Sequence, residues 1–409
     1  MDFEADMGIP SVPMVLSEFY EQETEKTHNE GMPGLRIEWI RGPVWGKTSE
    51  QLRRDVVNGT SPISGKNVMR EIVDHLTRPL TDDDIRTGTI ERGRGPETFT
   101  DTPDNLQKLF LEKRFTDFLP VILPTEEKVA EMLKGTSHDP DEALGKLAPT
   151  FGNAFEYWTF TVKDVAVNAV MAGCKPEYFP VILAVASTNK EGISVSDNSF
   201  VEGLVINGAI RNEIGLNSGI GAMGPYAHAN TTIGRAWSLY SINLGNCGKV
   251  GTTYMGTVGN PMNLINIVIA ENEEDSPFAP LSVRKGFKKN ENIVSLFEGW
   301  GVLSAKNWRA NTWDPVMNYP ETIKEIFSLQ DQMFGAAAVL SPPIANFVRN
   351  AGFETIEKFK EFLIEGPDGQ KYFQSPNQME IIVTGGSNNN YFSIGGMRYS
   401  SSVTIDDWR

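Results

Sequence analysis

Short apolar runs alternate with helix-permissive segments along most of the chain. Residues 8–16 and 35–40 have the composition of strands, and the polar segment 17–30 between them permits a helix. A strand, a helix and a second strand in this order are typical of a parallel sheet. Because no element precedes residue 8, we expect this first domain, residues 1–90, to be completed by a partner chain.

A polar, Gly- and Thr-rich stretch near residues 85–100 predicts a domain boundary, and regular patterns resume after it. The second and larger domain is expected to span residues 91–409. Its predicted helices cover 104–114, 126–134, 163–172 and 176–187, and its predicted strands cover 118–124, 201–207, 262–270 and 379–384. The expected fold class is therefore α/β, with two domains built on mainly parallel sheets.

The charge of the chain disfavours some classes of binding partner. The chain has 37 basic and 53 acidic residues, a net charge of −16. This excess of acid disfavours nucleic acid and anionic membrane surfaces, because both require basic residues. No apolar run approaches the roughly 20 residues that span a bilayer, and the acidic N-terminal segment does not resemble a signal peptide. We expect a cytoplasmic protein.

Two cysteines, Cys174 and Cys247, are too few for a disulfide framework. The chain has no CxxC pair, so a zinc ribbon or an iron–sulfur cluster held by this chain alone is not expected. Cys174 lies just before Pro176, and a helix start lowers a thiol pKa. Its apolar neighbours favour the alternative, a buried structural cysteine.

His138 lies among carboxylates and hydroxyls in an irregular segment. Such a histidine can act as an acid/base or bind a divalent metal, the only cofactor that the sequence suggests. The alternative is a capped turn, since Ser and Asp before Pro often start a helix. The candidate catalytic residues are His138, Asp139, Asp141 and Glu142, with His138 also the candidate metal ligand.

A long Gly- and Asn-rich loop, residues 207–230, precedes a helix that we expect Asn230, Thr231 or Thr232 to cap. Its glycines allow the backbone to approach a ligand, and the helix start offers N–H groups to an anion. No nucleotide-binding pattern is present. The alternative is a structural loop, although loops of this length are usually functional or disordered. The residues predicted to bind substrate here are Asn217, Ser218, Gly224, His228 and Asn230.

A second glycine-rich turn, Gly385-Gly386-Ser387, follows the predicted strand 379–384. Ligands of open α/β sheets bind beyond the carboxyl ends of strands, so these three residues are also predicted to bind substrate. The alternative is a plain turn. The acidic run 271–275 follows another strand and is expected to be a solvated face or a metal site.

Six segments resemble a group of bacterial proteins named for a Sec-Gly-Ser-Cys or Cys-Gly-Ser-Cys motif. They are GIPSVPMV, LRIEWIRGPVWG, KGTSHDPDE, NAVMAGCKPEYFPVILA, LNSGIGAMGPYAHANTTIGRA and VTGGSNNN. The first domain is more faintly similar to the selenocysteine-bearing subunit of glycine reductase, in which a selenol or thiol near the N-terminus attacks the substrate. This chain has no Cys before Cys174. The resemblance implies that the thiol has been lost or lies on a small Cys-containing subunit.

These patterns predict the large subunit of a small-molecule enzyme, an oxidoreductase or lyase that cleaves or reduces a polar bond with a thiol from its partner. One alternative is a non-catalytic scaffold or ligand-binding subunit. The other is a metal-dependent hydrolase or lyase centred on His138.

Overall fold

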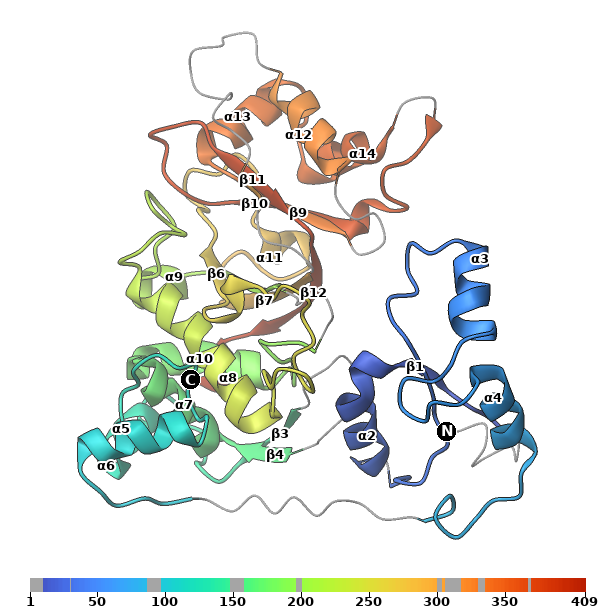
Figure 1. Cartoon of the computed structure of the whole chain (residues 1–409). Helices are drawn as coiled ribbons and strands as arrows, with labels where there is room; N and C mark the ends of the chain where they lie inside the picture. Colours follow the sequence, from blue (N-terminus) through green and yellow to red (C-terminus); the bar gives the residue numbers. More distant parts are fainter. Residues whose placement is uncertain are drawn as a thin grey trace.

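The computed structural model describes residues 10–29, 31–86, 97–147, 158–195, 201–299, 304–305, 318–329, 335–366 and 369–409. Helices and strands are mixed along these ranges, as expected for an α/β protein. No helix within them has both the length and the apolar character needed to cross a membrane. Residues 10–86 form an N-terminal unit beside a larger body built from the later residues (Figure 1).

The element bounds are as follows. The helices are α2 (Tyr20–Asn29), α3 (Ser49–Leu52), α4 (Val68–Thr77), α5 (Pro103–Glu112), α6 (Glu126–Leu133), α7 (Val162–Ala172), α8 (Phe179–Ala186), α9 (Ile210–Glu213), α10 (His228–Gly245), α11 (Leu281–Arg284), α12 (Tyr319–Phe327), α13 (Pro342–Asn350) and α14 (Ile356–Ile364). The strands are β1 (Met14–Leu16), β2 (Glu38–Ile40), β3 (Ala143–Leu147), β4 (Trp158–Thr161), β5 (Val201–Asn207), β6 (Ile267–Ala270), β7 (Ile293–Gly299), β8 (Ser304–Ala305), β9 (Ala336–Leu340), β10 (Met379–Val383), β11 (Phe392–Gly395) and β12 (Met397–Thr404).

The N-terminal unit is a two-stranded parallel sheet with helices packed on it. β1 pairs in parallel with β2, and α2 connects them, which confirms the predicted strand–helix–strand order. Trp39 of β2 packs on Tyr20 of α2, with ring centroids 4.9 Å apart. Side chains of successive strand residues point to opposite faces, so Glu38 points away from Trp39, toward Glu71 of α4. Burial and the charge of Glu71 raise the pKa of Glu38. The sheet therefore has α2 on one face and α4 on the other.

The body has four layers: helices, a sheet, a second sheet and helices. One sheet has the order β12-β7-β5-β6 and the other β10-β9-β11-β8. Helices α7, α8 and α10 cover the first sheet, and α12, α13 and α14 cover the second (Figure 1). Between the sheets lies a smaller apolar cluster that includes Val205, Phe297, Val339 and Ile382. Each sheet is thus buried on both faces.

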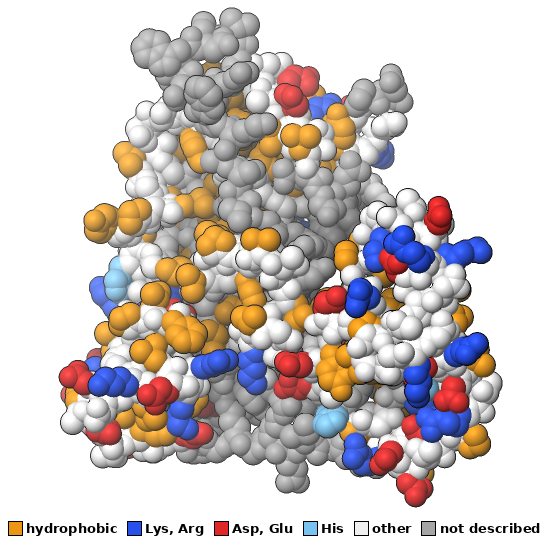
Figure 2. Space-filling view, in the orientation of Figure 1, with side chains coloured by type: hydrophobic (Ala, Val, Ile, Leu, Met, Phe, Trp, Pro, Cys, Tyr) orange, Lys and Arg blue, Asp and Glu red, His pale blue; other side chains and the backbone are white. Residues whose placement is uncertain are grey.

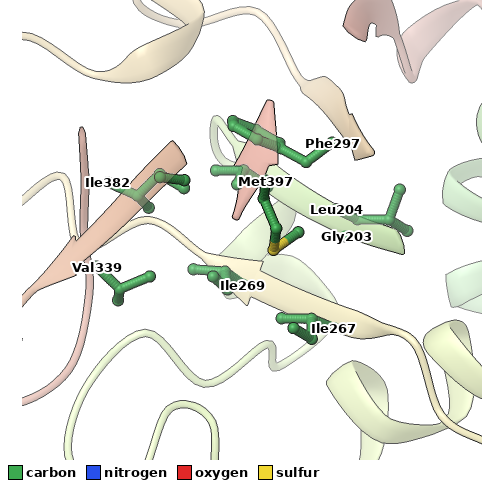
Figure 3. A pocket seen from close by; sticks show the side chains of 10 residues that line it. Gly203, Leu204, Ile267, Ile269, Phe297, Val339, Ile382 and Met397 are labelled. Atoms are coloured by element: carbon green, nitrogen blue, oxygen red, sulfur yellow. The ribbon is translucent and has the colours of Figure 1, made fainter. Parts of the chain in front are cut away.

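A void of about 10 Å³ lies in this middle cluster and is lined only by apolar residues and Gly203 (Figure 3). A site for one water molecule needs roughly this volume and polar partners as well. The void is therefore a local packing gap. A Cβ on Gly203 would lie 2.5 Å from Cε of Met397, so a larger residue here would displace the end of that flexible side chain.

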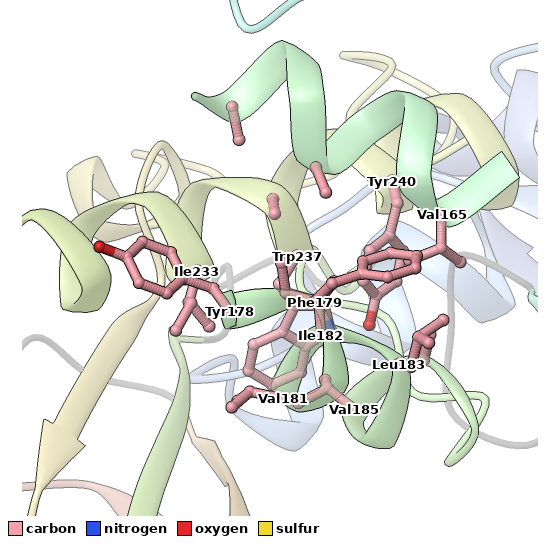
Figure 4. Close-up of a cluster of buried hydrophobic side chains, with 14 of the residues drawn as sticks. Val165, Tyr178, Phe179, Val181, Ile182, Leu183, Val185, Ile233, Trp237 and Tyr240 are labelled. Carbon is pink, nitrogen blue, oxygen red and sulfur yellow. The ribbon is translucent and has the colours of Figure 1, made fainter. Parts of the chain in front are cut away.

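The largest apolar cluster surrounds α8 (Figure 4). Every residue of α8 is buried, as expected for a helix that is apolar on all sides. Trp237 and Tyr240 of α10 and Phe179 of α8 are among the largest fully buried side chains of this cluster. Helix ends follow the signals in the sequence: the Thr125 side chain accepts a hydrogen bond and caps α6, and Gly173, with a φ of 86°, ends α7.

The prediction of mainly parallel sheets is wrong, because the sheets are mixed. β5 pairs in parallel with β6 and β9 with β10, whereas β7, β11 and β12 pair antiparallel with their neighbours. Strands between two layers are apolar on both faces, so they have the continuous apolar pattern usually seen in parallel sheets. Residues 118–124 form no strand: Phe118 has a φ of 64°, and Pro120 and Pro124 lack a backbone donor. The boundary predicted near residue 90 lies outside the described residues.

Candidate functional site

Two parallel strand pairs, β5–β6 and β9–β10, end near each other at one edge of the body. The Thr384 hydroxyl donates to the carbonyl oxygen of Ala270 at 2.7 Å, and the Asn272 N–H donates to the carbonyl oxygen of Val383 at 2.8 Å. The carboxyl ends of β6 and β10, which belong to different sheets, are therefore in contact. Because ligands bind beyond such strand ends, we take residues 215–230, 271–276 and 384–387 as the candidate site and call it the strand-end site.

The Gly-rich loop and the Gly385 turn lie against each other in this site. The Gly385 N–H donates to the carbonyl oxygen of Ser218 at 2.9 Å, and the Thr384 hydroxyl lies 3.4 Å from the same oxygen. A Cβ on Gly386 would lie 2.3 Å from Cγ1 of Ile220, so the close approach requires glycine. The structure thus brings together Ser218, Gly385 and Gly386 from two separately predicted segments. Ser387 follows with an exposed side chain.

Two asparagines predicted to bind substrate have side chains that hold the loop in place, and their role in substrate binding stays a prediction. The Asn217 side chain accepts from the N–H of Gly219 and donates to the carbonyl oxygen of Ile220, both at 3.0 Å. The Asn230 Oδ1 accepts from the N–H of Asn217 at 3.0 Å, while its Nδ2 donates to the carbonyl oxygen of Val268 at 3.1 Å. These contacts make both asparagines positioning residues for the backbone around Ser218.

The long buried helix α10 starts at the same site. It begins at His228 and not after Asn230, because the Asn230 amide bonds to β6 and to the loop and is not free to cap the helix. Ala227 precedes the helix and has no side chain that can cap it. His228 is exposed, and its Nδ1 lies 3.2 Å from the Tyr178 hydroxyl. Gly224, also a predicted binding residue, donates its N–H to Gly221 within a turn of the loop, at 2.8 Å.

The acidic run after β6 is partly buried and paired within the protein, while Glu274 and Asp275 at its end are exposed. Glu271 is buried and accepts a hydrogen bond from Nδ2 of Asn207 at 2.6 Å. Arg211 forms ion pairs with Glu273 at 3.2 Å and with Glu274 at 2.9 Å. Burial raises the pKa of Glu271, whereas the hydrogen bond from Arg211 lowers that of Glu274. This network fixes the backbone that carries Asn272 to the site.

His138 contacts a different part of the chain. Its Nδ1 lies 2.8 Å from a carboxylate oxygen of Glu142, and its Nε2 lies 2.7 Å from the carbonyl oxygen of Asp407. Its ring stacks on that of Trp408, with centroids 4.7 Å apart. The Asp407 carbonyl and the Glu142 carboxylate raise the pKa of His138. These contacts lead to residues 406–409, not to Ser218 or Gly385.

The neighbours of His138 complete this arrangement. Asp139 accepts a hydrogen bond from the N–H of Asp141 at 2.8 Å, as in a capped turn. Ser137 donates to the carbonyl oxygen of Arg409 at 2.5 Å. Within the described ranges, no group of three or more His, Cys, Asp or Glu side chains is arranged to hold a metal ion. Catalysis or metal binding by His138 stays a prediction.

Neither thiol is activated. Cys174 donates to the carbonyl oxygen of Thr232 at 3.2 Å, and burial raises its pKa to about 12. Cys247 is buried, and burial raises its pKa as well. The helix start beside Cys174 therefore does not make it a nucleophile.

Compared with protein-family models, curated proteins and solved structures, the chain shows no match. The resemblance to the Sec/Cys-Gly-Ser-Cys group stays an expectation, and the functional argument rests on geometry. Two residues of the strand-end site, Asn272 and Thr384, are missing from the predicted set. The predicted strand 379–384 includes Thr384, and Asn272 lies inside the acidic run. A polar residue directly after each apolar strand is the signal in the sequence that identifies them.

Proposed function

We propose that this chain is the large subunit of an enzyme acting on a small polar molecule, and that the substrate binds at the strand-end site. The contact between Ser218 and Gly385 carries the proposal, because it joins two glycine-rich segments at the ends of parallel strands. Glycine-rich backbone presents N–H and C=O groups to a ligand at short range. The substrate is thus expected to be recognised mainly by the backbone.

The start of α10 supports a substrate with an anionic group. The first N–H groups of a helix lack partners within the helix and carry a partial positive charge. Ala227 leaves them without a side-chain cap, and His228 places an imidazole beside them. A carboxylate or phosphate group would satisfy these donors.

The reactive thiol is expected on a second polypeptide. A thiol must ionise to attack a substrate, and with a pKa of about 12 the thiolate fraction of Cys174 near pH 7 is on the order of one in 10⁵. Cys174 is half-buried, and Cys247 is fully buried with a pKa that burial raises. This chain therefore supplies binding and orientation, and the partner supplies the nucleophile.

The N-terminal unit supports such a partner because it has little core of its own. Among its described residues the buried large apolar side chains are Trp39, Ile40 and Val68, and none belongs to the three apolar clusters of the body. Outward on α4, Met69, Val73 and Leu76 are 38%, 56% and 39% exposed. Apolar side chains also appear among charged ones on the visible surface of the unit (Figure 2). A partner that extends the two-stranded sheet and covers α4 would complete the unit.

Thiol labelling of the native complex tests the proposal. We expect Cys174 and Cys247 to react slowly with iodoacetamide near pH 7, and rapidly only after denaturation. Activity should be lost when a cysteine or selenocysteine of the second subunit is labelled, and Cys174→Ser should retain most activity. Fast stoichiometric labelling of Cys174 with parallel loss of activity would contradict the proposal and move the nucleophile into this chain.

Acetate and inorganic phosphate probe the anion site. Each should raise the melting temperature of the wild-type chain more than that of His228→Ala, with sodium chloride at equal ionic strength as the control. Equal shifts in both proteins would contradict an anion site at α10.

A non-catalytic ligand-binding subunit is the second candidate function. It is favoured by Asn217 and Asn230, whose side chains hold the loop and offer no acid/base chemistry. Turnover of the complete complex distinguishes the two candidates. A His228→Ala complex that retains turnover but binds substrate weakly indicates the binding role, whereas a loss of turnover at saturating substrate indicates catalysis.

A further inference from the structure

Three buried carboxylates meet at the amino end of β5, the end opposite to the strand-end site. Glu202 of β5 lies directly opposite Glu298 of β7, which in turn lies opposite Arg398 of β12. Glu191, in the segment after α8, lines the same narrow recess together with Lys190. Like charges directly opposite on neighbouring strands destabilise a sheet, so this arrangement needs compensation.

Glu298 receives most of the compensating contacts. Its carboxylate lies 3.0 Å from Nζ of Lys190 and 3.4 Å from a guanidinium nitrogen of Arg398. The Ser400 hydroxyl donates to it at 2.6 Å. Glu298 therefore has the contacts of an ionised carboxylate.

Glu202 has no comparable set of contacts. It is 2% exposed, and its Oε1 has no hydrogen-bond partner among the described residues. The buried Tyr240 hydroxyl is also without a partner there, and the nearby Glu191 contributes to its raised pKa. An ionised carboxylate in such a place is strongly unfavourable, whereas a protonated one can donate a hydrogen bond.

Burial and the charge of the neighbouring glutamates favour the protonated form. Burial raises the pKa of Glu191 to about 7, and burial together with Glu191 and Glu298 raises that of Glu202 above its ordinary value. The other groups facing them are Lys190 after α8, Arg398 on β12, and Tyr240 and Cys247 at α10.

We propose that Glu191 and Glu202 form a proton-binding site that holds at least one proton at neutral pH and makes the packing of residues 190–194 against β5 sensitive to pH. Loss of the proton places a second negative charge beside Glu298 and repels the segment. The native protein holds the proton more tightly than the unfolded chain. The stability of the native protein therefore falls as the pH rises from the ordinary pKa range of glutamate to about 7. The equilibrium constant for unfolding rises by up to about tenfold per pH unit for each proton released.

Melting temperatures of the full chain between pH 5 and pH 8.5 test this proposal. Glu202→Gln carries a neutral side chain at every pH, so it should melt at or below the wild-type temperature at pH 5 and above it at pH 8. Glu298→Gln loses its ion pairs and should melt lower at every pH. Glu354→Gln, an exposed control paired with Lys358, should follow the wild-type profile. A Glu202→Gln profile parallel to that of the wild type would overturn the proposal.

A measurement on the wild type covers the case in which Glu202→Gln does not fold. Infrared spectroscopy of the native protein at pH 7 should show the stretching band of a protonated carboxyl group that disappears as the pH is raised. Glu191→Gln should reduce this band. A native protein without the band at pH 7 would overturn the proposal.

Discussion

Asn230 uses both ends of its amide inside the protein. Its oxygen accepts from the loop and its nitrogen donates to β6, so the residue that the sequence marks as a helix cap and substrate ligand instead sets the position of the loop. Residue type predicts that an asparagine at a loop–helix junction bonds to the backbone. It does not predict which backbone, because Val268 is brought near by the packing of α10 on β6.

Asn230→Ala should loosen the loop around Ser218. The change removes the acceptor for the Asn217 N–H and the donor to Val268, at a cost of about 1–3 kcal/mol for buried groups left unpaired. Hydrogen exchange of residues 215–222 should rise, while exchange in α10 stays slow. Ser387→Ala, an exposed change in the facing turn, is the control. Unchanged exchange in the loop would show that Asn230 does not position it.

His138 also has structural contacts, and its catalytic or metal-binding role stays a prediction. Its ring is stacked on Trp408, and both ring nitrogens have acceptors when the imidazole is protonated. The side chain is 24% exposed, so it contributes to packing, contrary to what a surface-loop histidine would suggest. The sequence showed the local carboxylates but not residues 406–409, because they lie about 270 positions later in the chain.

His138→Ala should destabilise the contact with residues 406–409 in a pH-dependent way. Hydrogen bonds to Asp407 and Glu142 raise the pKa of His138 in the native state. The stabilisation from these bonds is therefore fully present at a pH below the ordinary histidine pKa, and it is lost as the pH rises through the raised native pKa. The melting difference between wild type and variant should be larger at pH 5.5 than at pH 8.5. His28→Ala on α2 is the matched control. A difference that grows with pH would contradict this assignment.

At the scale of elements, helices with clear start and stop signals were predicted from the sequence, whereas α12, α13, α14 and several strands were not. Caps, glycine stops and apolar faces mark α6, α7 and α8 in the sequence, and the structure has them at nearly the predicted bounds. β9 is only five small apolar residues, and β12 has a run of serines. Such strands are defined by pairing with β10 and β7, which is information from distant segments. For the same reason, both glycine-rich segments were visible in the sequence but their contact was not.

The turn after β10 contains two glycines, Gly385 and Gly386, that are constrained for different reasons. Gly385 has a φ of 95° and open space where a Cβ would lie, whereas Gly386 has the close approach to Ile220. Gly385→Ala should therefore cost about 1–2 kcal/mol through backbone strain alone. Gly386→Ala should instead displace the facing loop. Hydrogen exchange should rise in residues 384–388 for the first variant and in residues 217–221 for the second, and the reverse pattern would contradict the assignment.

At the scale of the whole molecule, the two parts differ in how they are stabilised. The body fills three interfaces with apolar clusters, but the N-terminal unit places Glu38 and Glu71 between its sheet and α4 while apolar residues of α4 face outward. The sparse apolar core of the N-terminal unit and the exposed side chains of α4 are the observations behind our proposal of a partner.

Val73→Lys on α4 should leave the isolated chain intact and weaken the native complex. An exposed substitution changes stability by only about 0.5 kcal/mol, whereas a charge buried against a partner is strongly unfavourable. Native mass spectrometry of the purified complex should show loss of the second subunit. Ile63→Lys, 49% exposed and outside α4, is the control. A large drop in the melting temperature of the isolated chain would show instead that Val73 is packed within it.

One residue, Gly396, joins β11 of the second sheet directly to β12 of the first. This short connection ties the two sheet layers together at the amino end of β5. At the opposite end, the hydrogen bonds of Thr384 to Ala270 and of Asn272 to Val383 also join the layers, so we do not expect a ligand to enter the strand-end site by separation of the layers. We expect a ligand to reach the site past the loop that contains Ile220 and Tyr226, whose side chains are 70% and 102% exposed. We expect ligand association to be gated by this loop, with an on-rate that levels off at high ligand concentration at the rate at which the loop opens.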